Sequence, residues 1–126
     1  MWQVLLVDDE PAIRNLLNTV LSRAGYRVRE ASNASQALDL LGEDLPDIII
    51  SDLMMPGLDG IELCNEVRSN PRTRGVPFVL LTAVSDPERH QQALRSGVNQ
   101  VLVKPVMPRT LSQAVQVMLA QGAIAH

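Results

Sequence analysis

The hydrophobic residues of the chain form short apolar runs that alternate with longer amphipathic segments. The apolar runs predict β-strands at residues 3–7, 26–30, 47–51, 77–81 and 100–103. Within the third run, Ile48-Ile49-Ile50 is an uninterrupted β-branched sequence. Such a sequence is typical of a strand that is covered on both faces of a parallel sheet.

The amphipathic segments predict five helices, each with a characteristic start or stop. They are expected from Pro11 to Gly25, from a cap at Ser32 or Asn33 to just before Gly42, over residues 58–69, from Asp86 to Gly97, and from Pro108 to Gln121. Proline suits the first turn of a helix, where its missing N–H has no partner to lose. Residues 121–126 are expected to form a frayed tail.

The alternation of five strands with five helices predicts the fold class. It is typical of an α/β protein with a doubly wound parallel sheet, right-handed crossovers and helices on both faces. Of the 126 residues, 46% are hydrophobic, which is enough to bury one core without metals or disulfides. Residues 1–126 are therefore expected to form a single domain.

Composition excludes several classes of function. The chain has 11 basic and 14 acidic residues and a net charge of −3, which offers no basic footprint for nucleic acid. We therefore expect no direct binding of nucleic acid by this chain. No apolar run approaches the ~20 residues that span a bilayer, so no membrane segment is expected. Cys64 is the only cysteine, which favours a reducing, cytoplasmic setting.

Residues suited to chemistry follow four of the predicted strands. They are Asp8-Asp9-Glu10 after the first strand, Asp52 after the third, Thr82 after the fourth and Lys104 after the fifth. In open α/β sheets, ligands bind beyond the carboxyl ends of the strands, where the strand order reverses. Lys104 is the only lysine of the chain, and lysine offers a compact charge that arginine does not. The pattern therefore predicts one site at one edge of the sheet.

Each of these residues also has a simpler explanation when it is taken alone. Asp9 or Glu10 could cap the helix that starts at Pro11, Asp52 could belong to a turn, and Thr82 could cap the next helix. These explanations would have to coincide at four strand ends. A shared site accounts for all of them at once.

The residue types at this edge favour phosphoryl transfer. Three carboxylates at one place repel one another and raise each other's pKa unless a cation neutralises them. Carboxylate oxygens without His or Cys suit Mg²⁺. A Mg²⁺ ion held by Asp8, Asp9 and Asp52 leaves a position for a phosphate oxygen, and the Thr82 hydroxyl and Lys104 ammonium can donate to the other oxygens. Asp52 would be the nucleophile and would form an aspartyl phosphate.

Four segments, Val7–Pro11, Ser51–Gly60, Leu81–Ala83 and Val103–Pro105, carry a resemblance to a known family. Their sequences are Val-Asp-Asp-Glu-Pro, Ser-Asp-Leu-Met-Met-Pro-Gly-Leu-Asp-Gly, Leu-Thr-Ala and Val-Lys-Pro. With them, the chain resembles the receiver domain of two-component response regulators along essentially its whole length. The resemblance implies a flavodoxin-like fold with strand order 2-1-3-4-5. It also implies a cis bond between Lys104 and Pro105.

The resemblance further implies a signalling switch, not an enzyme that turns over an external substrate. The phosphoryl donor would be a histidine kinase or a histidine phosphotransfer protein. The implied site residues are Asp52 as phosphoacceptor, Asp8, Asp9, Asp52 and the backbone carbonyl of Met54 as Mg²⁺ ligands, and Thr82 and Lys104 as phosphate contacts. The downstream partner would be another protein or an output domain outside this chain, and a second copy of the chain is a further candidate partner.

The sequence departs from the family pattern in two places. Many receivers carry an aromatic residue three positions before the lysine, whereas this chain has Val101. The aromatic part of the usual conformational switch is therefore missing. Two positions beyond Asp52 and two beyond Thr82, this chain has Met54 and Val84, which cannot orient a water molecule by hydrogen bonding. We therefore expect the phosphoryl group to persist longer than in receivers with amide and carboxylate side chains there.

Two other classes of protein share some of these features. Phosphatases and phosphotransferases of the haloacid dehalogenase type also use an aspartate nucleophile and Mg²⁺. They place Asp-x-Asp after the first strand, where this chain has the adjacent Asp8 and Asp9. A docking module that keeps only the fold usually lacks an acidic or lysine position, and none is missing here. The first strand follows directly on Met1, so we expect either a stand-alone receiver or the amino-terminal part of a longer regulator.

Overall fold

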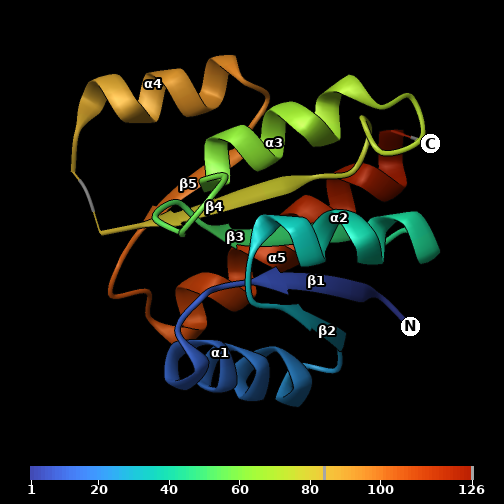
Figure 1. Cartoon of the computed structure of the whole chain (residues 1–126). Coiled ribbons are helices and arrows are strands. Elements are labelled where there is room, and N and C mark those ends of the chain that lie inside the picture. Colours follow the sequence, from blue (N-terminus) through green and yellow to red (C-terminus); the bar gives the residue numbers. More distant parts are fainter. Residues whose placement is uncertain (84, 126) are drawn as a thin grey trace.

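The computed structural model describes residues 1–83 and 85–125 and forms three layers, with helices on both faces of one sheet (Figure 1). Its elements are β1 (Gln3–Val7), α1 (Pro11–Arg23), β2 (Arg27–Ala31), α2 (Ala34–Glu43), β3 (Ile48–Asp52), α3 (Gly60–Ser69), β4 (Phe78–Thr82), α4 (Pro87–Arg95), β5 (Gln100–Val103) and α5 (Pro108–Ala125). Neighbouring strands are parallel, in the order β2-β1-β3-β4-β5. The predicted doubly wound fold with order 2-1-3-4-5 is confirmed.

Two hydrophobic clusters fill the spaces between the sheet and its helices. In β3, Ile48 and Ile50 pack with side chains of α1 and α5, whereas Ile49 packs with side chains of α2, α3 and α4. All three isoleucines are fully buried. The two groups of helices cover opposite faces of the sheet (Figure 1). Because successive strand residues point to opposite faces, an uninterrupted apolar strand supplies both clusters.

Three strands begin and end one residue later than predicted, while β1 and β5 have the predicted bounds. The shift places Asp52 and Thr82 at the ends of β3 and β4, where the sequence predicted them to follow the strands. Asp52 is in register with Leu81, and Thr82 is in register with Val103. Pairing with a neighbouring strand therefore extends each strand into a polar residue that local pattern would assign to a loop.

Two helices extend further than predicted, whereas α1 and α4 end at Arg23 and Arg95, two residues before the glycines expected at their ends. The helix expected to stop before Gly42 continues to Glu43, and Gly42 does not adopt a positive φ. This glycine is part of the helix and does not terminate it. Of the two candidate caps, Asn33 is the N-cap of α2 and accepts a hydrogen bond from the Gln36 N–H. α5 extends to Ala125, beyond the start of the frayed tail expected at 121–126, whereas residue 126 lies outside the described residues.

The start of α3 is also corrected, from residue 58 to Gly60. Asp59 accepts a hydrogen bond from the Glu62 N–H at 2.8 Å, and the Glu62 side chain accepts one from the Asp59 N–H at 3.0 Å. This reciprocal capping box fixes the first turn of the helix one residue after Asp59. The loop before it therefore ends later than the sequence predicted.

Gly60 lies where α3 begins directly against the end of β3. Its N–H donates a hydrogen bond to the Leu53 carbonyl oxygen at 2.8 Å. A Cβ atom at this position would collide with the backbone oxygen of Asp52 and would lie 2.6 Å from Leu80 Cδ1. The absence of a side chain at Gly60 thus permits the close approach of α3 to the strand that carries Asp52.

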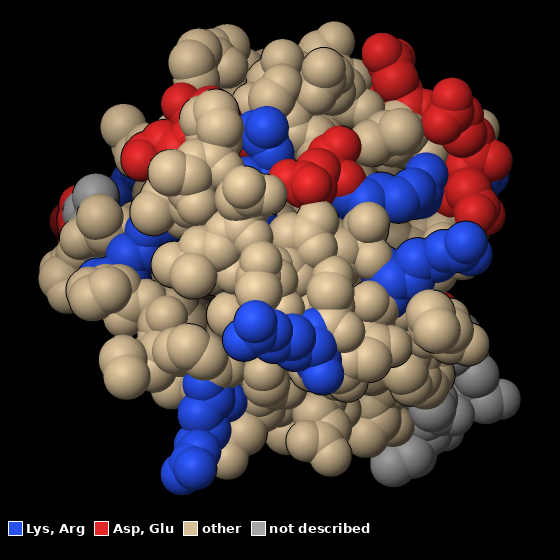
Figure 2. Space-filling view, turned by 90° about the horizontal axis from the view of Figure 1, so that it is seen from below, with Lys and Arg blue, Asp and Glu red and all other residues tan. Residues whose placement is uncertain are grey.

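The described face of the molecule seen from below carries both basic and acidic side chains (Figure 2). Among the described residues on this face, Lys and Arg are scattered among neutral and acidic residues and do not merge into one basic patch (Figure 2). Of the helices in the described part of the chain, none has both the length and the apolar character needed to cross a membrane.

Candidate functional site

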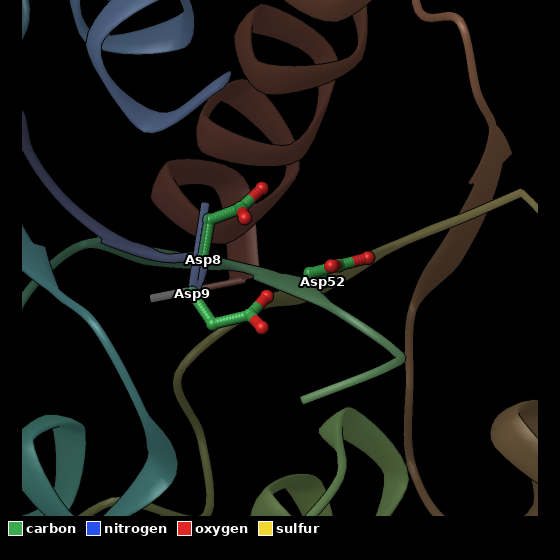
Figure 3. Close-up of side chains that lie close together, drawn as sticks. All are labelled: Asp8, Asp9 and Asp52. Carbon is green, nitrogen blue, oxygen red and sulfur yellow. The ribbon is translucent and has the colours of Figure 1, made fainter. Parts of the chain in front are cut away.

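The carboxyl edge of the sheet brings together the three aspartates singled out in the sequence. Asp8 and Asp9 directly follow β1, and Asp52 ends the adjacent strand β3. One carboxylate oxygen from each of them lies within 4.8 Å of the others. Figure 3 shows the three side chains side by side at this edge. The structure thus groups them as expected, and their individual roles stay predictions.

Asp8 is held at three of its four polar atoms. Its N–H donates to the Ala31 carbonyl oxygen at 3.1 Å, and its Oδ1 accepts from the Glu10 N–H at 2.9 Å. Its carbonyl oxygen accepts from Arg14 Nη1 at 2.7 Å. The fourth atom, Oδ2, is buried and has no hydrogen-bond partner among the described residues. A buried carboxylate oxygen without a partner is costly unless a cation or donor occupies the space in front of it.

Lys104 places its ammonium group against this carboxylate cluster. Its Nζ lies 3.1 Å from Asp52 Oδ1 and 3.6 Å from Asp8 Oδ2. Its backbone N–H donates to the Thr82 carbonyl oxygen at 2.8 Å, which ties the end of β5 to the end of β4. The Lys104-Pro105 peptide bond is cis, as predicted. The only lysine of the chain is therefore directed at the acidic site, where one positive charge faces three carboxylates.

The electrostatic environment of Asp52 is a balance of opposing effects. Burial raises the pKa of its carboxyl above the ordinary value, and the charges of Asp8 and Asp9 raise it further. The hydrogen bond and the positive charge of Lys104 act in the opposite direction, but the pKa remains raised. Burial and the two neighbouring carboxylates therefore outweigh the effect of Lys104 on the pKa of Asp52.

The donor set fits a bound Mg²⁺ ion. The three residues offer carboxylate oxygens, which are hard ligands, and the described cluster contains no His or Cys. Asp8 Oδ2 is buried and accepts no hydrogen bond from the described residues, and the Lys104 ammonium pairs with it only at 3.6 Å, so this oxygen remains able to bind a cation. Burial is the main cause of the raised pKa of Asp52, and the negative charges of Asp8 and Asp9 add to it; a cation in the cluster would offset those two charges.

Other predicted site residues lie around the cluster. Thr82 ends β4 and is fully buried. Met54 follows β3 by two residues and is 62% exposed. The metal contact predicted for the Met54 carbonyl stays a prediction. The role predicted for Val84 concerns a residue outside the described part of the chain.

Val101 occupies the position at which many receivers have an aromatic residue. It is half-buried, is in register with Leu80, and packs against the hydrophobic cluster on the side of α2, α3 and α4. A side chain of this size cannot sweep between an outward and an inward position as a long aromatic side chain does. The consequence for switching stays a prediction.

The structure adds three residues that the sequence analysis did not select. Arg14 and Asn18 on α1 both bind Glu30 on β2, and Arg14 also binds the Asp8 carbonyl oxygen. The sequence pattern indicates only that Arg14 and Asn18 are polar residues of an amphipathic helix. The one available signal was that they lie four residues apart, on the same helix face.

Fold and site together define a class of protein: a parallel α/β module with acidic residues at the ends of its first and third strands and a lysine after its fifth. Residues 4–116 match the family model of the response regulator receiver domain. The chain belongs to this family and is a receiver domain of two-component signalling.

Individual relatives agree with this assignment. The chain is 45% identical over 113 residues to a 14.6 kDa protein from the sodA1 3′ region of Leptolyngbya boryana, covering 90% of this chain and 86% of that protein. It is 40% identical over 122 residues to the transcriptional regulatory protein AfsQ1 of Streptomyces coelicolor, covering 97% of this chain and 53% of the regulator. The chain therefore spans about half the length of that regulator.

A solved structure shows the same fold. The chemotaxis protein CheY4 of Vibrio cholerae is 36% identical and superimposes with a TM-score of 0.89, covering 94% of this chain and 98% of that protein.

Proposed function

We propose that this receiver domain is a phosphorylation switch in which Asp52 accepts a phosphoryl group in a Mg²⁺-dependent reaction. The observation that carries the proposal is the position of Lys104 Nζ, 3.1 Å from Oδ1 of a buried aspartate that also lies beside Asp8 and Asp9. This combination supports a site for an anionic ligand next to a carboxylate nucleophile.

The proposed reaction joins a carboxylate oxygen of Asp52 to phosphorus while the bond between phosphorus and the imidazole nitrogen of the donor breaks. The departing imidazole takes up a proton. Asp52 reacts as the carboxylate, and Lys104 favours that form by lowering the pKa against the effect of burial. Lys104 then donates to a phosphoryl oxygen, and Thr82 supplies a hydroxyl at the end of β4. Asp8, Asp9, Asp52 and the Met54 carbonyl would hold Mg²⁺, which when bound neutralises charge on the phosphoryl oxygens.

The proposed partners follow from the family. The phosphoryl donor is a histidine kinase or a histidine phosphotransfer protein, and the output is a separate protein or a domain outside this chain. AfsQ1, about half of whose length this chain matches, is a transcriptional regulatory protein. We place the exchange in the cytoplasm, where a single buried thiol such as Cys64 stays reduced.

The test is incubation of the protein with acetyl phosphate and Mg²⁺, followed by intact mass measurement. We expect the mass of one added phosphoryl group, and no addition when EDTA removes the metal. A wild-type protein that gains no phosphoryl group would overturn the proposal and would favour a docking module that keeps only the fold.

Replacing Lys104 with arginine should slow phosphorylation although the charge is kept. The planar guanidinium is larger than an ammonium group and cannot occupy the same position 3.1 Å from Asp52 Oδ1 without displacing its neighbours. We expect the initial rate with acetyl phosphate to fall by about tenfold, which corresponds to ~1.4 kcal/mol. Arg109→Lys, the reverse exchange at an exposed position of α5, is the matched control. A Lys104→Arg variant as fast as wild type would contradict a role for the compact charge.

The lifetime of the phosphorylated protein should be limited by the approach of water past residue 54. Met54 lies two residues after Asp52 in the chain, is largely exposed, and offers no group that orients water. Met54→Asn, alone and combined with Val84→Glu, should accelerate the loss of phosphate by about tenfold in the double variant, since a fixed in-line water lowers the barrier by ~1.4 kcal/mol for each factor of ten. The measurement is the decay of phosphorylated protein in Mg²⁺ buffer. Equal or slower decay would show that these positions do not control the water.

A further inference from the structure

We propose that Arg14 is a positioning residue that fixes Asp8 for metal binding through the backbone, without touching the metal or the phosphate itself. The inference rests on the proposed function of the same site. It starts from the one hydrogen bond that reaches the acidic cluster from a side chain of α1, between Arg14 Nη1 and the Asp8 carbonyl oxygen at 2.7 Å.

Three of the four polar atoms of Asp8 are held by hydrogen bonds, and the fourth, Oδ2, has only the ion-pair contact with Lys104 at 3.6 Å. The backbone N–H and Oδ1 are held by backbone groups of Ala31 and Glu10, and the carbonyl oxygen is held by Arg14. These three hydrogen bonds fix both the peptide after β1 and the rotation of the carboxyl group. The remaining atom, buried Oδ2, is thereby directed toward Asp52 and Lys104. Loss of the Arg14 contact would free the peptide that carries the ligand.

Arg14 is itself held in place by a second contact. Its Nε lies 2.9 Å from Glu30 Oε1, and Asn18 Nδ2 donates to Glu30 Oε2 at 2.9 Å. The arginine and glutamate side chains are 19% and 34% exposed, so the pair is shielded on most of its surface. A planar guanidinium can bind Glu30 and the Asp8 carbonyl together, whereas a lysine ammonium has no such fork. α1, β2 and the end of β1 are joined at this point.

The arrangement also resolves an apparent conflict of charge. A positive side chain beside a metal site would ordinarily oppose the binding of a cation. Glu30 pairs with the guanidinium, so that Arg14 supplies a hydrogen bond to Asp8 while its charge is balanced locally. The two effects change Mg²⁺ affinity in opposite directions when Arg14 is removed. If charge repulsion dominated, the affinity would rise. If positioning dominates, as we propose, the affinity falls.

The experiment measures Mg²⁺ affinity directly, by titrating Mg²⁺ into the protein and following the backbone amide NMR signals of Asp9 and Glu10. We expect Arg14→Ala to raise the dissociation constant about tenfold, the lower end of the effect of residues that orient metal ligands. Arg14→Lys should lie closer to Arg14→Ala than to wild type, because it keeps the charge and loses the fork. Arg23→Ala, at an exposed arginine on the same helix, is the matched control and should bind as wild type does.

A second readout separates positioning from chemistry. In phosphorylation by acetyl phosphate, the Mg²⁺ concentration for half-maximal rate should rise in Arg14→Ala, while the rate at saturating Mg²⁺ should stay within about twofold of wild type. An unchanged or tighter Mg²⁺ dissociation constant in Arg14→Ala, with normal binding by wild type, would overturn this inference alone. Absence of Mg²⁺ binding by wild type would overturn the proposed function and the inference with it.

Discussion

Asp52→Asn is expected to abolish phosphorylation by acetyl phosphate and Mg²⁺. Asn keeps the size and shape of the side chain, but its amide has no charged oxygen that can attack phosphorus. Asp8 is not an equivalent acceptor, because its Oδ1 already accepts a hydrogen bond from the Glu10 N–H and its side chain is 1% exposed, against 7% for Asp52. Intact mass should therefore show one added phosphoryl group on wild type and none on the variant.

A matched control variant tests whether the loss is specific to Asp52. Asp39→Asn makes the same chemical change at an exposed position of α2 and should leave phosphorylation intact. A phosphoryl group that persists on Asp52→Asn would show that another residue is the acceptor and would contradict the assignment.

Thermal unfolding of Asp52→Asn separates lost chemistry from lost structure. The pKa of Asp52 is raised in the folded state by burial and by its acidic neighbours, so its ionised form costs folding free energy at neutral pH, and stability falls as pH rises through the raised pKa. The neutral Asn lacks this cost. In Mg²⁺-free buffer at neutral pH, the variant should therefore unfold at the wild-type temperature or above it.

Gly60→Ala is expected to destabilise the domain by about 3 kcal/mol, the upper range for inserting a methyl group into a filled space. The added Cβ would meet the backbone oxygen of Asp52, and the other near atoms are Leu80 Cδ1 at 2.6 Å and Leu53 Cα at 3.0 Å. Two of the three are backbone atoms, which cannot move aside as the end of a flexible side chain can. The measurement is the free energy of unfolding in urea.

Gly42→Ala provides a control with the opposite expected sign. Gly42 lies inside α2, has no positive φ, and a Cβ there meets no atom within 4 Å. Alanine in a helix is favoured over glycine by about 0.5–1 kcal/mol, so this variant should be slightly more stable than wild type. If the two variants changed stability equally, close packing at Gly60 would not be the cause.

Local patterns in the sequence were sufficient to predict the order and type of every strand and helix. The Ile48-Ile49-Ile50 run in β3 is an example, because burial on both faces requires apolar residues at every position. The gathering of Asp8, Asp9 and Asp52 was also predictable, because the carboxyl ends of parallel strands lie at the same edge of a sheet. For these features, residue type and chain order carry the necessary information.

The predicted boundaries failed where pairing or packing between distant segments decides the conformation. Asp52 and Thr82 became strand residues because neighbouring strands supply partners in register. Gly42 was predicted to end α2. Its backbone does not turn to positive φ, the conformation in which glycine commonly ends a helix, and the helix continues through it.

The tertiary structure alone decided which oxygen of Asp8 remains available to a ligand. Arg14 and Glu30 lie 16 residues apart in the chain, on a helix and a strand, and neither has a motif that connects it to Asp8. Their contact with each other and with the Asp8 carbonyl exists only because α1 packs beside β2 and over the end of β1. The identity of the acidic residues was therefore encoded locally. The direction of Asp8 Oδ2 depends on hydrogen bonds whose partners come together only in the folded chain.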